Sequence, residues 1–510
     1  VQASVQQIQQ EWGAITAIIH GAGVNTPKPL RMLDKNDFLR TLGPKVRGLE
    51  HLLAAIEQES LKLLITFGSI IAQTGLPGEA DYGLANEWLH RLVQQYQADH
   101  PHCRCLNLEW SIWSGVGMGE RLGRIDTLIQ RGITPISVDT GVSVLHRLID
   151  SSLPDASVVV TGRFGQLPTV NFAGSQLPFW RFLEQPRVHY PGVELVVDAD
   201  ISIFTDHYLD DHVYQGEQIF PGVMGLEAMA QVVMALLDTS ELPRLTKVKF
   251  SHPVVVPANS PVKIRIAALR RESGEVDVVL RSEQTAFSTN HFQATCYVEQ
   301  KRQASEWRSP INPPLLLAME HPQQDIYGDI LFHRGSFQRL SSYHHLRATE
   351  CVAEITPTQP MGWFSQYLPQ ALVLGDPGAK DAAIHALQAC IPQATILPTG
   401  IDQLIIYDAD VTTTRFVQAK ERQQIGNTFI YDVDVITADG KIIEHWQGLQ
   451  LQVIKRRDTS LPWAVSLLAP YLERRLQEVV ATNDWAIAVV QEPAAPRQIR
   501  SDRVIHKALT

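Results

Sequence analysis

The sequence predicts a parallel α/β domain followed by an α+β domain built from two similar halves. Residues 1–165 alternate short apolar runs with helical stretches, which is the pattern of a doubly wound sheet. From about residue 193, long segments with a period of two indicate antiparallel strands. Two apolar helices, expected at 222–237 and 381–390, each accompany such a set of strands. The second domain is therefore expected to repeat one structural unit.

The elements of the first domain follow from its apolar runs. Strands are expected at 14–23, 61–69, 103–110 and 156–164, with helices at 46–58 and 85–96 between them. A loop-rich stretch then interrupts the pattern, so a linker is expected at 171–192 and the first domain at 1–170.

The second domain is expected at 193–455. Its strands are predicted at 245–256, 262–271, 275–282 and 291–300, then near 413–421, 427–437 and 442–454. The remaining segment, 456–510, carries a helical stretch at 464–480 and an Arg-rich tail, and receives no function.

Composition excludes several classes of protein. The 510 residues carry a formal charge of −10, which argues against a nucleic-acid partner because phosphate neutralisation needs a basic face. No apolar run approaches the roughly 20 residues of a membrane span. The five cysteines are scattered, which is typical of reduced thiols and predicts a cytoplasmic protein. Cys103 and Cys105 are interpreted as structural because no second ligand pair lies nearby, so no metal site is expected.

The segment 211–231 carries the clearest chemistry. His212 precedes a turn at Gly216, and Pro221 and Gly222 open an apolar helix. The free backbone N–H groups of such a helix start would stabilise the oxygen of an enolising thioester. A neutral imidazole beside them would accept the α-proton, so His212 is predicted to be a general base.

A matching acid is expected in the second half. Asp381 starts the second apolar helix and His385 follows one turn later on the same face. Burial among apolar walls is expected to raise the pKa of Asp381 and keep it protonated. Two alternatives stay open: Asp381 as a helix N-cap, and Glu227 on the first helix as the acid. Asp206, His207 and Asp211 are interpreted as solvated loop residues.

These residues resemble the motifs of polyketide synthase dehydratases. His212, Gly216 and Pro221 match the spacing H-x3-G-x4-P, and Asp381 with His385 matches D-x3-Q/H. Residues 335–337 resemble the element Y-G-P-x-F without its tyrosine or proline, and 397–401 stands at the L-P-F-x-W element without its aromatic residue. The resemblance implies a double hot-dog fold over 193–455. The phrases at 222–231 and 374–392 are most similar to enediyne-type iterative synthases.

The first domain resembles the ketoreductases of the same synthases. Lys45, Ser69, Tyr82 and Asn86 lie at separations of 24, 13 and 4 residues, with lysine upstream as in the polyketide branch of short-chain dehydrogenases. The resemblance implies that Tyr82, acidified by Lys45, protonates a carbonyl while NADPH delivers hydride. A glycine-rich phosphate loop is expected before these motifs and is not found. We therefore expect the catalytic part of a Rossmann-type ketoreductase without its nucleotide-binding half, in a piece of a larger synthase.

The predicted function is a dehydratase that converts a 3-hydroxyacyl thioester into an α,β-unsaturated thioester, giving a polyene on repetition, with no cofactor. The alternatives are a non-catalytic double hot-dog chamber or platform, and a hot-dog thioesterase. The resemblance implies an acyl carrier protein with phosphopantetheine-bound substrate, other synthase domains and a second copy of the chain as partners. Four arginines, either contacts for an acidic carrier or simply solvated, are Arg270, Arg271, Arg302 and Arg339.

Overall fold

A computed structural model describes residues 1–123, 125–153, 155–165, 176–298, 306–311, 317–328, 330–358, 362–458, 463–480, 486–490, 498–501 and 507–508. The chain divides into two compact units, Val1–Asn171 and Phe172–Thr510. The first unit is parallel α/β and the second is antiparallel α+β, which confirms the predicted fold class.

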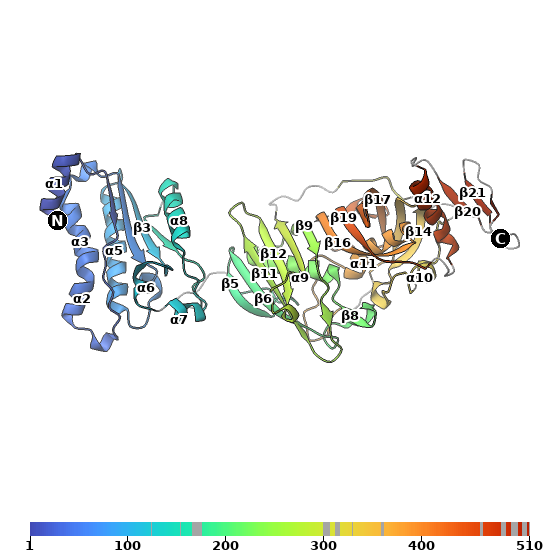
Figure 1. Cartoon of the computed structure of the whole chain (residues 1–510), viewed down its shortest axis with the longest axis horizontal. Helices are drawn as coiled ribbons and strands as arrows, with labels where there is room; N and C mark the ends of the chain where they lie inside the picture. Colours follow the sequence, from blue (N-terminus) through green and yellow to red (C-terminus); the bar gives the residue numbers. More distant parts are fainter. Residues whose placement is uncertain are drawn as a thin grey trace. The chain divides into compact units, whose positions relative to one another are not determined.

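The first unit is a four-stranded parallel sheet in the order β1-β2-β3-β4 (Figure 1). Helices α3 and α5 pack on one face of this sheet and α8 on the other. The strands are β1 Ala17–His20, β2 Leu63–Ser69, β3 Arg104–Trp110 and β4 Ser157–Val160. The helices are α1 Gln2–Trp12, α2 Lys35–Leu42, α3 Gly48–Ala55, α4 Ile71–Thr74, α5 Ala80–Asp99, α6 Gly117–Arg121, α7 Ile125–Gln130 and α8 Val138–Asp150, with a π-turn η2 at Gly43–Arg47 and 3-10 turns η1 Leu30–Met32 and η3 Gln58–Ser60.

The second unit is organised by one twelve-stranded antiparallel sheet in the order β14-β15-β17-β18-β19-β16-β9-β13-β12-β11-β6-β5. The six strands from β9 to β5 form one half with helix α9 (Gly222–Leu237), and the other six form the second half with α11 (Pro377–His385). The strands of the first half are β5 Gln185–Tyr190, β6 Glu194–Ile201, β9 Arg244–Phe250, β11 Val262–Arg270, β12 Val276–Ser282 and β13 Phe292–Tyr297. Those of the second are β14 Leu340–Leu346, β15 Glu350–Ile355, β16 Ala394–Ile406, β17 Arg415–Ile425, β18 Thr428–Thr437 and β19 Ile442–Arg456.

Shorter elements complete this unit. They are β7 Val213–Tyr214, β8 Glu217–Ile219 and β10 Val255–Val256, the helices α10 Pro322–Asp325 and α12 Leu468–Val479, the strands β20 Ile487–Val490, β21 Gln498–Ser501 and β22 Lys507–Ala508, and the 3-10 turns η4 His207–Asp211, η5 Glu283–Thr285, η6 Gly335–Phe337, η7 Ala386–Cys390 and η8 Val465–Leu467. Among the described helices, none combines the length and apolar character required to cross a bilayer.

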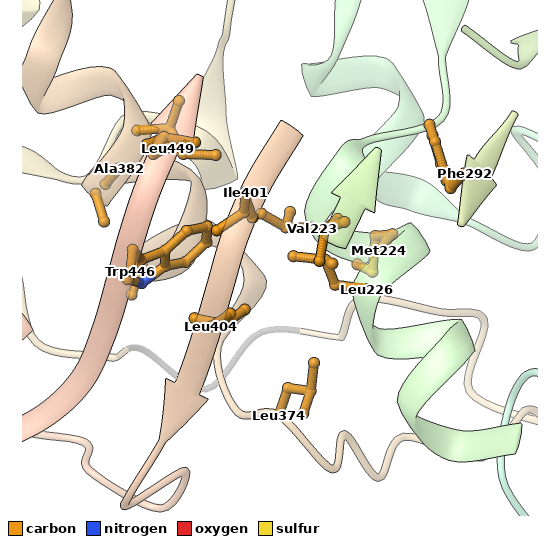
Figure 2. Packing of buried hydrophobic residues seen from close by; sticks show 14 of the residues in the cluster. Val223, Met224, Leu226, Phe292, Leu374, Ala382, Ile401, Leu404, Trp446 and Leu449 are labelled. Carbon is orange, nitrogen blue, oxygen red and sulfur yellow. The ribbon is translucent and has the colours of Figure 1, made fainter. Parts of the chain in front are cut away.

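The two halves join where β9 pairs with β16. The backbones approach closely here, and a Cβ on Gly400 would stand 2.9 Å from the Val248 carbonyl oxygen. One apolar core continues across the junction: Figure 2 shows Val223 and Leu226 of α9 near Ile401 of β16, with Trp446 of β19 beyond it. Every residue of α9 from Val223 to Leu236 is buried, so this helix is enclosed on all sides, and apart from Glu227 and Gln231 these residues are apolar or glycine.

Two predicted helices differ in detail from the structure, and two strands were not predicted. The helix expected at 381–390 begins at Pro377, and its last turn, Ala386–Cys390, is a 3-10 helix. The helix expected at 46–58 is a π-turn followed by α3. Strands β14 and β15 were not predicted, although the burial of β15 alternates with a period of two.

Candidate active site

A tight hairpin positions His212. Strands β7 and β8 are joined by Gln215 and Gly216, whose φ angles are 51° and 87°, so both occupy the left-handed region of a type I′ turn. The turn returns the chain so that Ile219 faces His212. The Ile219 N–H donates to the His212 carbonyl at 3.0 Å, and His212 Nδ1 lies 2.7 Å from the Ile219 carbonyl oxygen. A carbonyl only accepts, so Nδ1 carries the proton and Nε2 keeps its lone pair.

Asp381 lies in the second turn of α11 and faces the same place. Its Oδ2 is 3.0 Å from His385 Nε2, as expected for neighbours one turn apart. Asp381 is not the N-cap: Asp376 holds that position and accepts from the Gly378 and Ala379 N–H groups at 3.0 and 3.4 Å. The side chain of Asp381 is therefore not used to cap the helix.

A third histidine, not predicted from the sequence, completes the cluster. His333 is 5% exposed, and its Nε2 lies 3.4 Å from Asp381 Oδ2. Its ring centroid is 4.8 Å from that of His212 and 3.9 Å from that of His385. His333 lies two residues before the segment 335–337, which resembles a family element in sequence. This proximity was the signal that could have indicated a role for His333.

The segment that carries His333 is held against the loop of His212. The Ser336 N–H donates to the Asp211 carboxylate at 2.8 Å and the Arg334 N–H to the Asp211 carbonyl. Phe337 is fully buried with its ring 5.4 Å from that of His212. Asp211 is thus not a free solvated residue, which corrects the interpretation from sequence.

The electrostatics differ from expectation at Asp381. Burial opposes its charge, but the nearby His385 and His212 outweigh that effect and lower its pKa below the ordinary value. The prediction of a raised pKa is therefore wrong. Burial also lowers the pKa of His212, against the attraction of Asp381, and lowers that of His333 strongly. The cluster thus pairs an ionised carboxylate with neutral His212 and His333.

A cavity of about 440 Å³ opens onto this cluster. His212, His333, Asp381 and His385 line it together with largely apolar side chains, among them Phe250, Phe292, Phe332, Ile384 and Ile396. Gly222 and residues 397–399 also line it. Helix α9 begins at Gly222, which lines this cavity, and no side chain caps its first backbone N–H groups.

Glu227 has a different environment. Its carboxylate accepts from the Val373 and Leu374 N–H groups at 2.6 and 2.8 Å and from Gln231 Nε2 at 2.8 Å. It is 1% exposed and is not among the residues that line the cavity. Its bonds tie α9 to the segment that leads into α11.

Two further surface interpretations from sequence are wrong. Asp206 is fully buried and forms an ion pair with Arg181 at 2.9 Å. Arg339 is 5% exposed and donates to the Pro357 carbonyl and Asp376, so it offers no surface for a carrier. Arg270 and Arg271 are exposed, His207 is exposed as expected, and Arg302 lies outside the described residues.

In the first unit, the four ketoreductase-type residues converge. Lys45 Nζ donates to the Phe67 carbonyl at 2.9 Å and lies 5.5 Å from the centre of the Tyr82 ring, while Asn86 Nδ2 donates to the Tyr82 carbonyl at 2.7 Å. Ser69 ends β2 beside them and contacts Tyr82. Burial lowers the pKa of Lys45 to about 8. Burial raises the pKa of Tyr82 to about 12, so the expected acidification of Tyr82 is wrong for this state.

The described part of this unit does not show the features that hold a dinucleotide. After β1, the stretch Gly21–Gly23 leads into a loop, and the next α-helix begins only at Lys35. No described strand of this unit runs through a glycine-rich turn directly into a helix N-terminus, which is the usual pyrophosphate site.

Three parts of the chain match models of known protein families. Residues 183–283 match a model described as the polyketide synthase dehydratase domain, and 317–460 match one described as the polyketide synthase dehydratase N-terminal domain. Residues 1–115 match the KR domain. A stretch similar to ketoreductases is thus followed along the chain by two stretches similar to polyketide synthase dehydratases.

Two relatives and one solved structure are similar to parts of this chain. Over 399 residues the chain is 21% identical to a polyunsaturated fatty acid synthase of Thraustochytrium, covering 77% of this chain and 13% of that protein. Over 149 residues it is 28% identical to polyketide synthase PksN of Bacillus subtilis, covering 28% of this chain and 3% of the relative. The chain therefore spans a small part of these relatives. A solved trans-AT polyketide synthase dehydratase domain from Brevibacillus brevis is 18% identical, with a TM-score of 0.44 over 55% of this chain and all of that one.

Proposed function

We propose that the second unit eliminates water from a carrier-bound 3-hydroxyacyl thioester. The observation that carries this proposal is the meeting of His212 and Asp381, one from each half, in a single apolar cavity. One ligand-type atom of each, together with one of His333, lies within 4.8 Å of the others. A base and a proton donor at this separation can address adjacent carbons of one substrate.

The chemistry follows from the side-chain states. The thioester carbonyl would face the N-terminus of α9, where backbone N–H groups stabilise the developing enolate oxygen. His212 Nε2 takes the α-proton, and the hydroxyl leaves with a proton as water. His212 becomes an imidazolium, and the product is the α,β-unsaturated thioester.

The leaving hydroxyl needs a proton. Because the pKa of Asp381 is lowered, its carboxylate by itself is ionised and has no proton to give. Asp381 Oδ2 and His385 Nε2 are 3.0 Å apart, close enough to share one proton. We assign proton donation to the singly protonated form of this pair. Asp381 touches the hydroxyl and passes on the proton that lies between its Oδ2 and His385 Nε2; the pair then takes up a proton from solvent, and the imidazolium of His212 releases one. Glu227 is disfavoured as the acid because its carboxylate is engaged by backbone N–H groups away from the cavity.

The domain boundaries, partners, cofactor and cellular location are also part of the proposal. We assign 1–170 to a ketoreductase catalytic part, 171–192 to a linker, 193–455 to the dehydratase and 456–510 to an extension. An enediyne-type iterative synthase with a polyene product, an acyl carrier protein bearing phosphopantetheine, other synthase domains and homodimerisation are predictions from the motifs. NADPH is predicted for a complete ketoreductase, and a cytoplasmic location from cysteine usage.

The test is incubation of the chain with a 3-hydroxyacyl pantetheine thioester and mass spectrometry of the products. We expect loss of water with wild type and with His345→Ala, an exposed histidine on β14 that serves as control, and none with His212→Ala. Release of free acid would identify a thioesterase. Acyl binding without chemistry in the wild type would identify a chamber.

A further inference from the structure

We propose that His212, His333 and Asp381 form a binding site for a transition-metal ion of the Zn²⁺ or Co²⁺ type, and that the ion blocks the active site. The binding does not depend on the function proposed above. The inhibition does, because it is expressed as loss of water elimination.

The donor set matches such an ion. Two imidazoles and one carboxylate each offer an atom, these atoms lie within 4.8 Å of one another, and all three residues are buried. Two histidines with a carboxylate are a known zinc-binding set with an open position. A tetrahedral ion with bonds of about 2.0–2.1 Å separates its ligands by about 3.3 Å. His333 Nε2 and Asp381 Oδ2 are already 3.4 Å apart, so closure requires only a shift of His212.

The surroundings of His212 suit a metal ligand. Histidines that bind metals usually donate their other ring N–H to a carbonyl or carboxylate, which fixes the ligating nitrogen. The 2.7 Å bond from His212 Nδ1 to the Ile219 carbonyl provides this, and it leaves Nε2 free.

The carboxylate of Asp381 also has an oxygen that is free to accept a further interaction. Among the described residues, Asp381 Oδ2 and His385 Nε2 are buried without a well-aligned hydrogen bond, although they lie 3.0 Å apart. A buried polar atom without a partner is costly, and a cation would satisfy Oδ2.

Metal binding and proton abstraction exclude each other. Both use the single lone pair on His212 Nε2, so an ion held there removes the proposed base. The cavity of about 440 Å³ gives the ion an entry path and leaves room for water on its open position.

The test begins with spectroscopy of the chelator-treated full chain titrated with Co²⁺. We expect the visible d–d absorption of a site with nitrogen and oxygen ligands, at one equivalent, displaced by Zn²⁺. His333→Ala and His333→Gln should weaken binding more than about tenfold, and His345→Ala should not. Thermal melting by circular dichroism confirms that the variants fold.

Each result decides the proposal. Absence of these bands in the wild type would overturn it, as would bands that persist unchanged in both folded His333 variants, since these would indicate another site such as the cysteines. Zn²⁺ should also suppress water elimination by wild type, with recovery on chelation. Intact Co²⁺ bands with undiminished elimination would overturn the inhibitory role. A chelator-treated enzyme that binds Co²⁺ but never eliminates water would refute the proposed function alone.

Discussion

The variants Glu227→Gln and Asp381→Asn distinguish a carboxylate that stabilises the fold from one that takes part in the reaction. Glu227→Gln keeps the shape of the side chain, but its NH₂ group must face one of the two backbone N–H donors at 2.6 and 2.8 Å. Leaving one buried donor unpaired costs about 2 kcal/mol of unfolding free energy. For a unit of this size, that loss lowers the melting temperature by roughly 3 °C.

Asp381→Asn has the opposite expected profile. The fold should be retained, because Asp381 neither caps α11 nor bonds to the backbone in the described contacts. Water elimination should fall at least about 100-fold, the usual size of a lost general acid or base.

The assay measures thioester dehydration by mass spectrometry alongside thermal melting for both variants. Glu227→Gln should melt earlier and still eliminate water at a rate within a few-fold of wild type. A folded Glu227→Gln without turnover, beside an active Asp381→Asn, would reverse the assignment of the acid.

Three further outcomes concern stability. Gly225→Ala should lower the melting temperature of the second unit, because the new Cβ would stand 2.2 Å from the Phe292 ring; a melt unchanged by the substitution would show that the ring moves freely. Lys380→Met should cost about 3–5 kcal/mol, since it strands the buried Glu444 that Lys380 contacts at 2.5 Å, and urea unfolding measures the loss. Lys45 has a folded pKa of about 8 against 10.5 unfolded, so the unfolded state binds more protons between these values. The free energy of unfolding of the first unit should therefore rise with pH across that window by up to about 3 kcal/mol, and Lys45→Met should remove this rise.

Local patterns determined much of this protein. The apolar run at 222–237 predicts α9 to the residue, because a helix buried on all sides is built mostly from apolar side chains, and this one starts after a proline with a glycine. The spacing from His212 to Gly216 predicts the turn that orients the histidine, because two positive φ angles favour glycine. Both signals are contained within a short stretch of chain.

Tertiary structure alone decided the rest. His333 lies 121 residues from His212 and 48 from Asp381, and only the docking of its segment on Asp211 brings the three together. The pKa of Asp381 depends on the distance to His385 and His212, so a sequence that shows a buried carboxyl predicts the wrong direction. Sequence patterns specify which groups are available, whereas the charge states and the third histidine follow from distances that only the folded chain fixes.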